Sequence, residues 1–340
     1  MSRRTTFRRR ASVAGAALAS AALVVSLAAC SGQASAEDAG SSAAGTVTIA
    51  AHTNGAGTET TLKVDKVAKI ADELPASVKS SGKLVIGVGA LPAGFPPLAF
   101  TGDDQKTLTG SEPDLGRLVA AVLGLKPEIK NATWDNLFVG IDTGATNVGF
   151  SNITDTEQRK EKYDFASYRK DELAFTVLKK NTWEFDGDYK NLAGLTVAVS
   201  SGTNQEKILL EWKAKLEAAG KTLNIKYYPD ANSTYLALNS GKIDANFGPN
   251  PTGAYQNTQS AKSANPTRTA GTFSGAGDSL QGLIAATVKK GSGLDKPIAD
   301  AINHLIENGQ YAKWLKAYNL TNEGLPTSEI NPPGLPLDNQ

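Results

Sequence analysis

The sequence contains very little cysteine and histidine. Among 340 residues there is one cysteine, Cys30, and there are two histidines, His52 and His304. A single thiol excludes a disulfide framework, and two imidazoles are too few for a histidine-rich metal site. The same scarcity of cysteine and histidine argues against catalysis by a cysteine nucleophile or by a Ser-His-Asp triad. We therefore expect no bound metal and no cofactor.

The chain also lacks an excess of either charge. It carries 35 basic and 34 acidic side chains, and five of the basic ones fall within the first ten residues, so the remainder is slightly acidic. A nucleic acid is therefore not expected as a partner. Apolar residues make up 40% of the chain, which is enough for a sizeable core and excludes a disordered polyelectrolyte.

The N-terminus has the pattern of an export signal. Residues 3–10 hold five arginines and no acidic residue, and residues 11–27 form an alanine-rich apolar run. At about 17 residues this run is short for a permanent membrane span, and a basic segment before it is typical of a secretory signal peptide. The arginine pairs leave open whether export follows the general or the twin-arginine route.

Small residues precede the only thiol. The run Leu27-Ala28-Ala29-Cys30 resembles the lipobox of bacterial lipoproteins. The resemblance implies that residues 1–29 are cleaved as a signal peptide and that the sulfur of Cys30 is lipidated. A multiply acylated Cys30 would hold the mature chain on the outer face of the cytoplasmic membrane, because one acyl chain binds a bilayer only marginally. The alternative is an ordinary signal peptide with an incidental cysteine.

Composition divides the rest of the chain into three parts. Residues 31–57 are mostly Ala, Gly, Ser and Thr, so residues 30–79 are predicted to be a flexible tether with a short helix within 61–80. About 240 residues of compact sequence follow, near the size at which one core splits into two. Residues 321–340 contain four prolines and are predicted to lie extended on the surface.

The compact part alternates between apolar runs and amphipathic segments. Residues 84–88 form a run of the buried-strand kind, and Leu115, Leu118 and Val122 then recur at helical spacing before Gly124. Ser111 is the expected N-cap of this helix. Further strands are predicted over residues 147–150, 173–179, 196–200, 225–228, 243–247 and 283–289, and helices over 134–143, 204–219, 234–239, 297–306 and 311–318. This alternation predicts an α/β fold of mostly parallel sheets covered by helices.

Two stretches of the compact part have similar sequence patterns and are here called the echoing stretches. Residues 141–150 and 238–247 each contain a helix end, a glycine (Gly144 or Gly241) and an apolar strand. Chance similarity is one explanation, because glycine caps are common. The other is a pair of lobes of similar build. Since α/β sheets bind ligands beyond the carboxyl ends of their strands, two facing lobes would put both edges on one cleft.

The first candidate binding segment joins a strand to a helix at residues 200–206. The N-terminus of the helix presents unpaired N–H groups, Gly202 allows close approach of the backbone, and Thr203 adds a hydroxyl donor. A carboxylate would be bound well by such a turn. The alternative is that these residues only cap the helix, as they do in most strand-to-helix turns.

The second candidate segment, residues 151–159, follows a buried strand and contains clustered polar side chains. Asn152 and Thr154 are potential donors, and the planar guanidinium of Arg159 can grip a carboxylate with two hydrogen bonds. The alternative is a solvated helix face, because Lys160 and Lys162 lie next to Arg159.

Several short segments occur along the compact part in a fixed order: residues 82–88, 95–100, 108–110, 114–115, 134–137, 153–160, 163–166, 192–199, 202–203, 241–245 and 309–314. Through these segments the chain resembles the family 3 extracellular solute-binding proteins, which are the polar amino-acid receptors of bacterial ABC importers. These segments occur in the family's order and cover the chain from about residue 80 to residue 320.

The resemblance implies a two-lobed fold of the periplasmic-binding-protein kind, with a mostly parallel sheet in each lobe. One lobe would contain residues 80–178 and 284–320, the other residues 181–278, and two crossing strands would join them. It implies that Arg159 holds the α-carboxylate of a ligand, helped by Asn152 and Thr154, and by Gly202 and Thr203 of the opposite lobe. Phe95 and Trp134 would line the side-chain pocket, although both also suit packing roles.

One segment departs from the family pattern. Family members that bind amino acids often carry an aspartate, which meets the α-ammonium, where this chain has Phe247-Gly248-Pro249-Asn250. A neutral Asn250 accepts a hydrogen bond but does not balance a buried positive charge. Either another acid, Glu112 or Asp155, takes this role, or the ligand is not a simple α-amino acid.

The predicted function is reversible capture of a small solute. A carboxylate-bearing ligand, an amino acid or a derivative, would bind between the lobes and favour their closure. The expected partners are an ABC permease with its ATPase, and the membrane through the lipid on Cys30, with the protein as a monomer and not an enzyme.

Two other functions stay open. One is a dehydratase of small carboxylic acids on the same scaffold, with Glu112, Asp155 or Glu206 as general acid. The other is a surface lipoprotein that only signals or adheres.

Overall fold

The computed structural model describes residues 45–338, all of which belong to one compact unit, Ala36–Gln340. The predicted signal peptide, the lipidated Cys30 and the first part of the predicted tether lie outside these residues. None of the helices in residues 45–338 has the length and apolarity needed to cross a bilayer.

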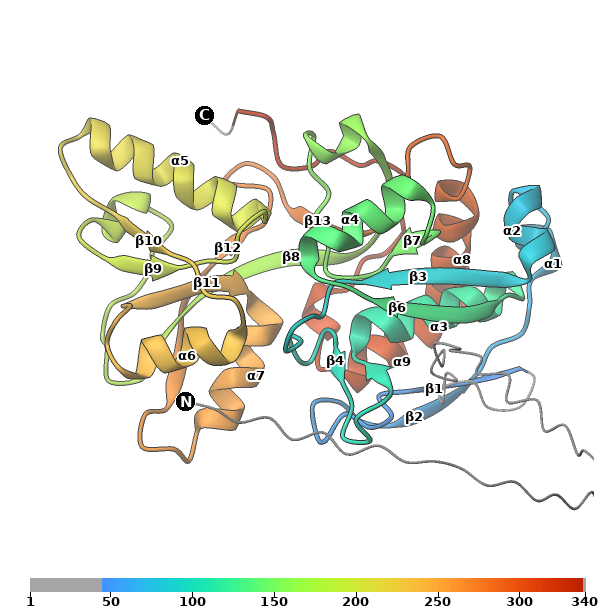
Figure 1. Ribbon diagram of the computed structural model, residues 1–340, viewed down its shortest axis with the longest axis horizontal. Helices are drawn as coiled ribbons and strands as arrows, with labels where there is room; N and C mark the ends of the chain where they lie inside the picture. Colours follow the sequence, from blue (N-terminus) through green and yellow to red (C-terminus); the bar gives the residue numbers. More distant parts are fainter. Residues whose placement is uncertain (1–44, 339–340) are drawn as a thin grey trace, which may run out of the picture. The chain divides into compact units, whose positions relative to one another are not determined.

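A nine-stranded sheet runs through both halves of the described chain (Figure 1). Its strands are β3 (Lys83–Val88), β6 (Lys126–Asn131), β7 (Val148–Gly149), β8 (Tyr163–Leu178), β9 (Thr196–Ala198), β10 (Asn224–Lys226), β11 (Ala245–Pro249), β12 (Thr267–Ser274) and β13 (Gly282–Lys289). Their order is β10-β9-β11-β8-β13-β7-β3-β6, and β12 pairs with β8 beside this path.

The sheet is parallel at both ends and antiparallel in the middle. At one end β3 pairs in parallel with β6 and β7, and at the other β9 pairs in parallel with β10 and β11. The first half of β8 pairs antiparallel with β13, and its second half with β11 and β12. Strand β8 therefore passes from one lobe into the other, and the chain returns between β12 and β13. The predicted two-lobed α/β fold is confirmed.

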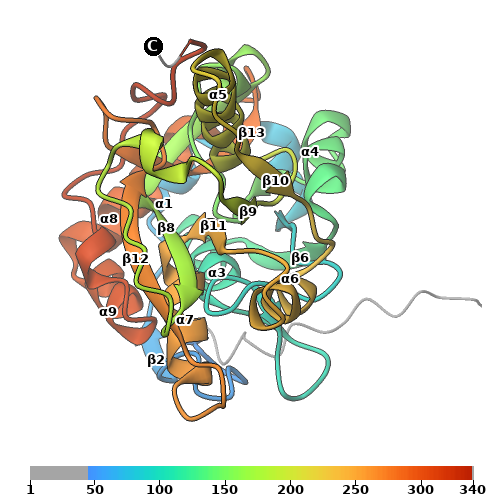
Figure 2. The same ribbon diagram turned by 90° about the vertical axis from the view of Figure 1, so that its left-hand side faces the viewer.

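Each lobe has its own helices and its own apolar core. In the first lobe the main helices are α3 (Ser111–Leu123), α4 (Trp134–Thr143), α8 (Asp295–Glu307) and α9 (Gln310–Ala317), and in the second α5 (Asn204–Ala218), α6 (Ala231–Asn239) and α7 (Asn250–Ser260). In the second lobe α5 lies on one side of the strands, and α6 and α7 lie on the other (Figures 1 and 2). Separate clusters of buried side chains form around Trp314 in the first lobe and around Trp212 in the second.

The two echoing stretches occupy equivalent positions in the lobes. Helix α4 ends at Gly144 and leads to β7, and helix α6 ends just before Gly241 and leads to β11. Both glycines have left-handed backbone angles, with φ of 75° and 71°, which side chains with a Cβ rarely adopt. The similarity of the two stretches therefore agrees with a pair of lobes of similar build.

The short helix predicted within residues 61–80 is present, but the prediction of a flexible tether is wrong for residues 45–79. These residues form a β-hairpin of β1 (Thr46–Ile49) and β2 (Thr60–Lys63), followed by two short helices, α1 (Ala68–Ala71) and α2 (Ala76–Ser81). Val47, Ile49 and Leu62 are buried in the core of the first lobe. Composition concealed this hairpin because the small residues around it outweigh the alternation of Thr and Val or Ile, which is the pattern of a half-buried strand.

Two smaller predictions also need correction. The N-cap of α3 is Gly110, with φ of 118°, and Ser111 is the first helical residue. The tail after the short helix Thr321–Glu323 is mostly extended but does not simply lie on the surface, because Leu335 is 1% exposed and packs in the core of the second lobe. A two-stranded ribbon of β4 (Phe100–Thr101) and β5 (Leu108–Thr109) completes the described elements.

Candidate functional site

Two hollows lie between the lobes. The first, here called the Phe95 cavity, has a volume of about 460 Å³ and is lined by the loop of residues 89–95 in the first lobe and by Ser200, Ser201 and Tyr228 in the second. The second, here called the Arg159 groove, has a volume of about 830 Å³ and is lined by residues of α4 and α5 and by Arg159. Both lobes contribute to each hollow, as capture by lobe closure requires.

The predicted ligand-binding residues divide between these hollows. Phe95, Trp134 and Asn152 line the Phe95 cavity, Arg159 and Gly202 line the Arg159 groove, and Thr203 lines both. Thr154 and Asn250 line neither. The roles of these residues in ligand binding remain predictions, which the contacts described below refine.

Arg159 begins a short helix, Arg159–Glu161, and its guanidinium spans the two lobes. One nitrogen donates to the carbonyl of Thr154 at 2.8 Å, and the other donates to the carbonyl of Gly202 at 3.2 Å. The rings of Trp134 and Phe138 lie 5.4 Å from the guanidinium carbon, which is the range of cation–π attraction. Burial lowers the pKa of Arg159 to about 10, so the charge is kept at neutral pH.

The carbonyl of Gly202 is a shared acceptor. The indole N–H of Trp134 donates to this oxygen at 3.1 Å, beside the bond from Arg159. Trp134 begins α4 and Gly202 precedes α5, so both donors belong to the first lobe and the acceptor to the second. These contacts join the lobes beside the Phe95 cavity and the Arg159 groove, which share Thr203 and Asn204 as lining residues.

The side chain of Thr203 serves the helix that follows. Its hydroxyl donates to the carbonyl of Ser200 at 2.7 Å and accepts the N–H of Glu206 at 3.3 Å. Glu206 in turn accepts the N–H of Gly202 at 2.6 Å, an arrangement close to a capping box. The capping role that the sequence left open is therefore present. The next residue, Asn204, also lines the Phe95 cavity, although nothing in the sequence pattern singled it out.

Asp171 ties the two lobes together from within. One of its carboxylate oxygens accepts the hydroxyl of Thr154 at 2.7 Å and the side-chain amide of Asn204 at 2.9 Å. Asp171 is 1% exposed, and burial raises the pKa of its carboxyl. Thr154, predicted to donate to a ligand, is thus hydrogen-bonded to Asp171.

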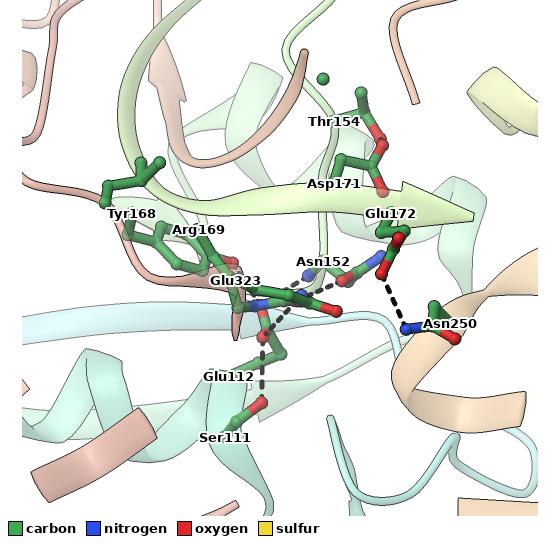
Figure 3. A network of polar contacts seen from close by, with 12 residues as sticks. Ser111, Glu112, Asn152, Thr154, Tyr168, Arg169, Asp171, Glu172, Asn250 and Glu323 are labelled. Atoms are coloured by element: carbon green, nitrogen blue, oxygen red, sulfur yellow. Dashed lines mark hydrogen bonds and ion pairs between the residues drawn. The ribbon is translucent and has the colours of Figure 1, made fainter. Parts of the chain in front are cut away.

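A network of buried charges surrounds Arg169 on β8 (Figure 3). Its guanidinium pairs with Glu112 of α3 at 3.3 Å and with Glu323. It also donates to the side-chain oxygen of Asn152. Arg169, Glu112 and Glu323 are each at most 2% exposed. Their contacts reach the wall of the Phe95 cavity through Asn152.

The acid nearest to Asn250 is not one of the two predicted from the sequence. The amide of Asn250 donates to Glu172 at 2.9 Å (Figure 3). Glu112 is fully buried and accepts the backbone N–H of Asn152 at 2.7 Å. Asp155 is also fully buried, and its backbone carbonyl accepts the N–H of Leu335 in the C-terminal tail. Neither Glu112 nor Asp155 lines the Phe95 cavity.

The titration of Asp155 should be visible in the stability of the protein. Burial raises its pKa from 3.8 to about 7, although Lys160 lies 3.4 Å away and opposes this shift. A carboxyl whose pKa is raised by folding stabilises the fold most at pH values below its unfolded pKa, and this contribution is lost as the pH rises through the folded pKa. We expect its contribution to the free energy of unfolding to fall by up to about 1.4 kcal/mol per pH unit between pH 4 and pH 7.

The measurement is urea unfolding of the wild type and of Asp155→Asn across this pH range. The fall due to Asp155 should be absent from the variant, which keeps an uncharged side chain of nearly the same size. Glu157→Gln is a suitable comparison, because Glu157 also contacts Lys160, at 2.8 Å, but is half-buried. Parallel curves for the wild type and Asp155→Asn would contradict the assignment.

The charge of the Phe95 cavity is negative. Two carboxylates line it, Asp135 from α4 and Asp230, which caps α6. No Lys, Arg or His occurs among its lining residues, all of which lie within the described chain. Aromatic rings of Phe95, Trp134 and Tyr228 line the same cavity. Within residues 45–338, no three His, Cys, Asp or Glu side chains are arranged to hold a metal ion.

Comparisons with known proteins agree with this architecture. The family model described as bacterial extracellular solute-binding proteins, family 3, matches residues 86–321. The L-cystine-binding protein TcyJ of Escherichia coli K12 is 34% identical over 184 residues, or 53% of this chain and 64% of that protein. The arginine-binding protein ArgT of Corynebacterium glutamicum is 29% identical over 270 residues, or 78% of this chain and 84% of that protein.

Solved structures resemble the chain as well. An ancestral arginine-binding protein bound to arginine has 26% sequence identity and a TM-score of 0.60, over 70% of this chain and 98% of that one. The chain thus spans nearly the whole of this structure but less than two thirds of the length of TcyJ. The parts of the chain beyond residues 86–321 are additional to the family model.

Proposed function

Because the chain belongs to the bacterial extracellular solute-binding proteins, family 3, we propose that it captures an amino acid or a derivative for an ABC importer by closure of its lobes. The observation that carries the proposal is the Phe95 cavity, which both lobes line. Its volume of about 460 Å³ is in the range of small-molecule sites. The names of TcyJ and ArgT, which bind cystine and arginine, support an amino acid as ligand.

The carboxylate of the ligand would bind where α5 begins. Thr203 and Asn204 line the Phe95 cavity at this helix N-terminus, whose free N–H groups favour an anion. Arg159 already contacts the same turn through the carbonyl of Gly202. A carboxylate would be a stronger acceptor for Arg159 than this carbonyl, because charge-assisted hydrogen bonds are stronger than neutral ones. Arg159 would therefore exchange one acceptor for the other when the ligand binds.

The opposite end of the ligand would be cationic. Asp135 and Asp230 approach the cavity from different lobes, and a positive group between them would reduce their repulsion as the lobes close. The rings of Trp134 and Tyr228 offer cation–π contacts. Arginine, the ligand in the name of ArgT, has this charge, so a basic amino acid is the ligand class we favour.

The proposal also covers the partners of the protein, its attachment to the membrane and its oligomeric state. We propose a permease and its ATPase as partners, attachment to the outer face of the membrane through Cys30, and a monomeric state. A dehydratase is less favoured, because Glu112, Asp155 and Glu206 all have partners within the protein. Only Glu206 of these three lines one of the two hollows. Recovery of the bound compound unaltered after long incubation would separate binding from catalysis.

Calorimetric titration with a panel of amino acids tests the proposal. We expect L-arginine or L-lysine to bind at least about tenfold more tightly than L-glutamine, which is equivalent to about 1.4 kcal/mol. Asp230→Asn should reduce this preference, because asparagine keeps the N-cap of α6 but removes the charge. Failure of every amino acid in the panel to bind would contradict the proposed function.

A matched control distinguishes charge in the cavity from helix capping. Asp188 caps the short helix Tyr189–Leu192 in the same lobe, as Asp230 caps α6, but it does not line the cavity. Asp188→Asn should leave the affinities unchanged. An equal loss in both variants would show that the effect of Asp230→Asn does not arise in the cavity.

A further inference from the structure

The C-terminal residues 326–338, here called the strap, form a feature that the family model does not include. The match to the family model ends at residue 321, whereas the structure describes the chain up to residue 338. The strap leaves the first lobe after α9, and its end lies beside α5 of the second lobe (Figures 1 and 2). It therefore passes from one lobe to the other outside the two connections made by β8 and by the return from β12 to β13.

The first part of the strap is fixed to the first lobe and to the start of β8. Ser328 donates its N–H to the side chain of Asn303 on α8 at 2.7 Å and accepts the amide of the same side chain at 3.1 Å. Ser167 of β8 donates its N–H to the carbonyl of Glu329 at 3.0 Å. Asn331 makes a reciprocal pair with the backbone of Phe165, at 2.8 and 3.0 Å.

The second part of the strap pairs with the loop that leads to Arg159. Leu335 donates its N–H to the carbonyl of Asp155 at 3.2 Å, and its own carbonyl accepts the N–H of Glu157 at 3.0 Å. Gly334 donates to the side chain of Glu157 at 2.9 Å. A Cβ on Gly334 would lie 2.5 Å from the carbonyl oxygen of Asp155, so only glycine fits so close to the loop.

The strap ends in the apolar core of the second lobe. Leu335 is 1% exposed and belongs to the cluster that contains Leu209 and Trp212 of α5. It also lines the Arg159 groove together with Leu210 of α5. Leu337, two residues later, is 54% exposed. One side chain of the strap is thus inserted into the lobe opposite to the one that holds its backbone.

We propose that the strap is a third connection between the lobes and that Leu335 is a positioning residue that favours the closed arrangement. Rotation of the second lobe away from the first would draw Leu335 out of the apolar cluster, because its backbone is fixed to the Asp155 loop. Opening would therefore expose apolar surface that the closed arrangement buries. By raising the closed fraction, the strap raises the apparent affinity for a ligand that binds the closed form, and this consequence rests on the proposed function.

Spin labels on the full mature chain test this without any ligand. Val139→Cys on α4 and Leu236→Cys on α6 are exposed positions on opposite lobes, and a Cys30→Ser background removes the native thiol. Pulsed electron–electron double resonance then gives the distribution of distances between the two spin labels, and hence between the lobes. We expect Leu335→Ala to raise the ratio of open to closed molecules about tenfold, and Leu337→Ala, the matched control, to leave this ratio unchanged.

A second variant and a binding measurement complete the test. Gly334→Ala should also raise the open fraction, because its Cβ displaces the strap without changing the apolar core, and it serves if Leu335→Ala does not fold. With L-arginine as probe, Leu335→Ala should raise the apparent Kd about threefold to tenfold. Distance distributions equal to the wild type in the folded variants would overturn the proposal. A change in distances without any binding of L-arginine would support the strap and count against the proposed ligand.

Discussion

Replacement of Arg169 by methionine is expected to lower the free energy of unfolding by about 3–5 kcal/mol. Arg169 is the cation between two buried carboxylates, Glu112 and Glu323. Methionine keeps much of the volume of the side chain but leaves both carboxylates without the cation that pairs with them. The loss of one member of a buried ion pair is costly because the remaining charge is neither hydrated nor compensated. Urea unfolding at neutral pH gives the value.

Two further variants show whether charge is the cause. In Arg169→Met combined with Glu323→Gln, part of the loss should be recovered, because one uncompensated carboxylate is removed. Lys296→Met is the control, since Lys296 also pairs with two carboxylates, Glu73 and Asp300, but does so at the surface, where such pairs contribute little. A loss for Arg169→Met no larger than that for Lys296→Met would refute the role of the buried network.

Replacement of Arg159 by alanine is expected to weaken ligand binding by about 2–5 kcal/mol. This follows from the proposal that Arg159 holds the carboxylate of the ligand, and it corresponds to a change from micromolar to millimolar affinity or weaker. The variant also loses one of the two donors to the carbonyl of Gly202, so closure of the lobes is weakened as well. Isothermal titration calorimetry with the amino acid that binds the wild type most tightly measures the change.

Two further variants test whether the geometry of the guanidinium, and not only a positive charge in the groove, is required for binding. Arg159→Lys should recover little, because a single ammonium does not reproduce two parallel hydrogen bonds from a planar group. Lys162→Ala is the control, since Lys162 also lines the Arg159 groove but is exposed, and the carbonyl of Gly202 accepts from Trp134 and Arg159 instead. An unchanged dissociation constant for Arg159→Ala would exclude Arg159 as the carboxylate receptor.

The elements that the sequence predicts best are those with local signals at both ends. Helix α4 has the predicted bounds, residues 134–143, because the hydroxyl of Thr133 accepts the N–H of Asn136 and Gly144 ends the helix in a left-handed conformation. Helix α7 (Asn250–Ser260) was not predicted, since its sequence contains Pro251, Gly253 and several residues of low helix propensity. Its helical form depends on packing against β12 and β8.

The same reasoning explains what was missed around the site. The first half of β8 contains Ser167, Arg169 and Asp171, which are polar and yet buried, so its pattern does not indicate a strand. Their partners come from distant parts of the chain: Glu112, Asn204 and Glu323. A burial that depends on such long-range pairing leaves no periodic signal. Local clusters of polar residues indicated Arg159 and Thr203, and the resemblance to the family gave them roles, but the matched residues end before the strap.

The junction at Gly202 has a consequence for how the protein can vary. Its acceptor is a main-chain oxygen, so a substitution at position 202 would not remove it. Gly202 nevertheless has a left-handed φ of 75°, and a Cβ there would lie 3.3 Å from the indole nitrogen of Trp134, so a side chain at this position would strain the turn. Mutation can therefore weaken this junction through either donor, or by distorting the turn, but it cannot delete the acceptor. The identity of the residue therefore matters at three positions, 134 and 159 for the donors and 202 for the conformation of the turn, whereas the oxygen itself belongs to the backbone.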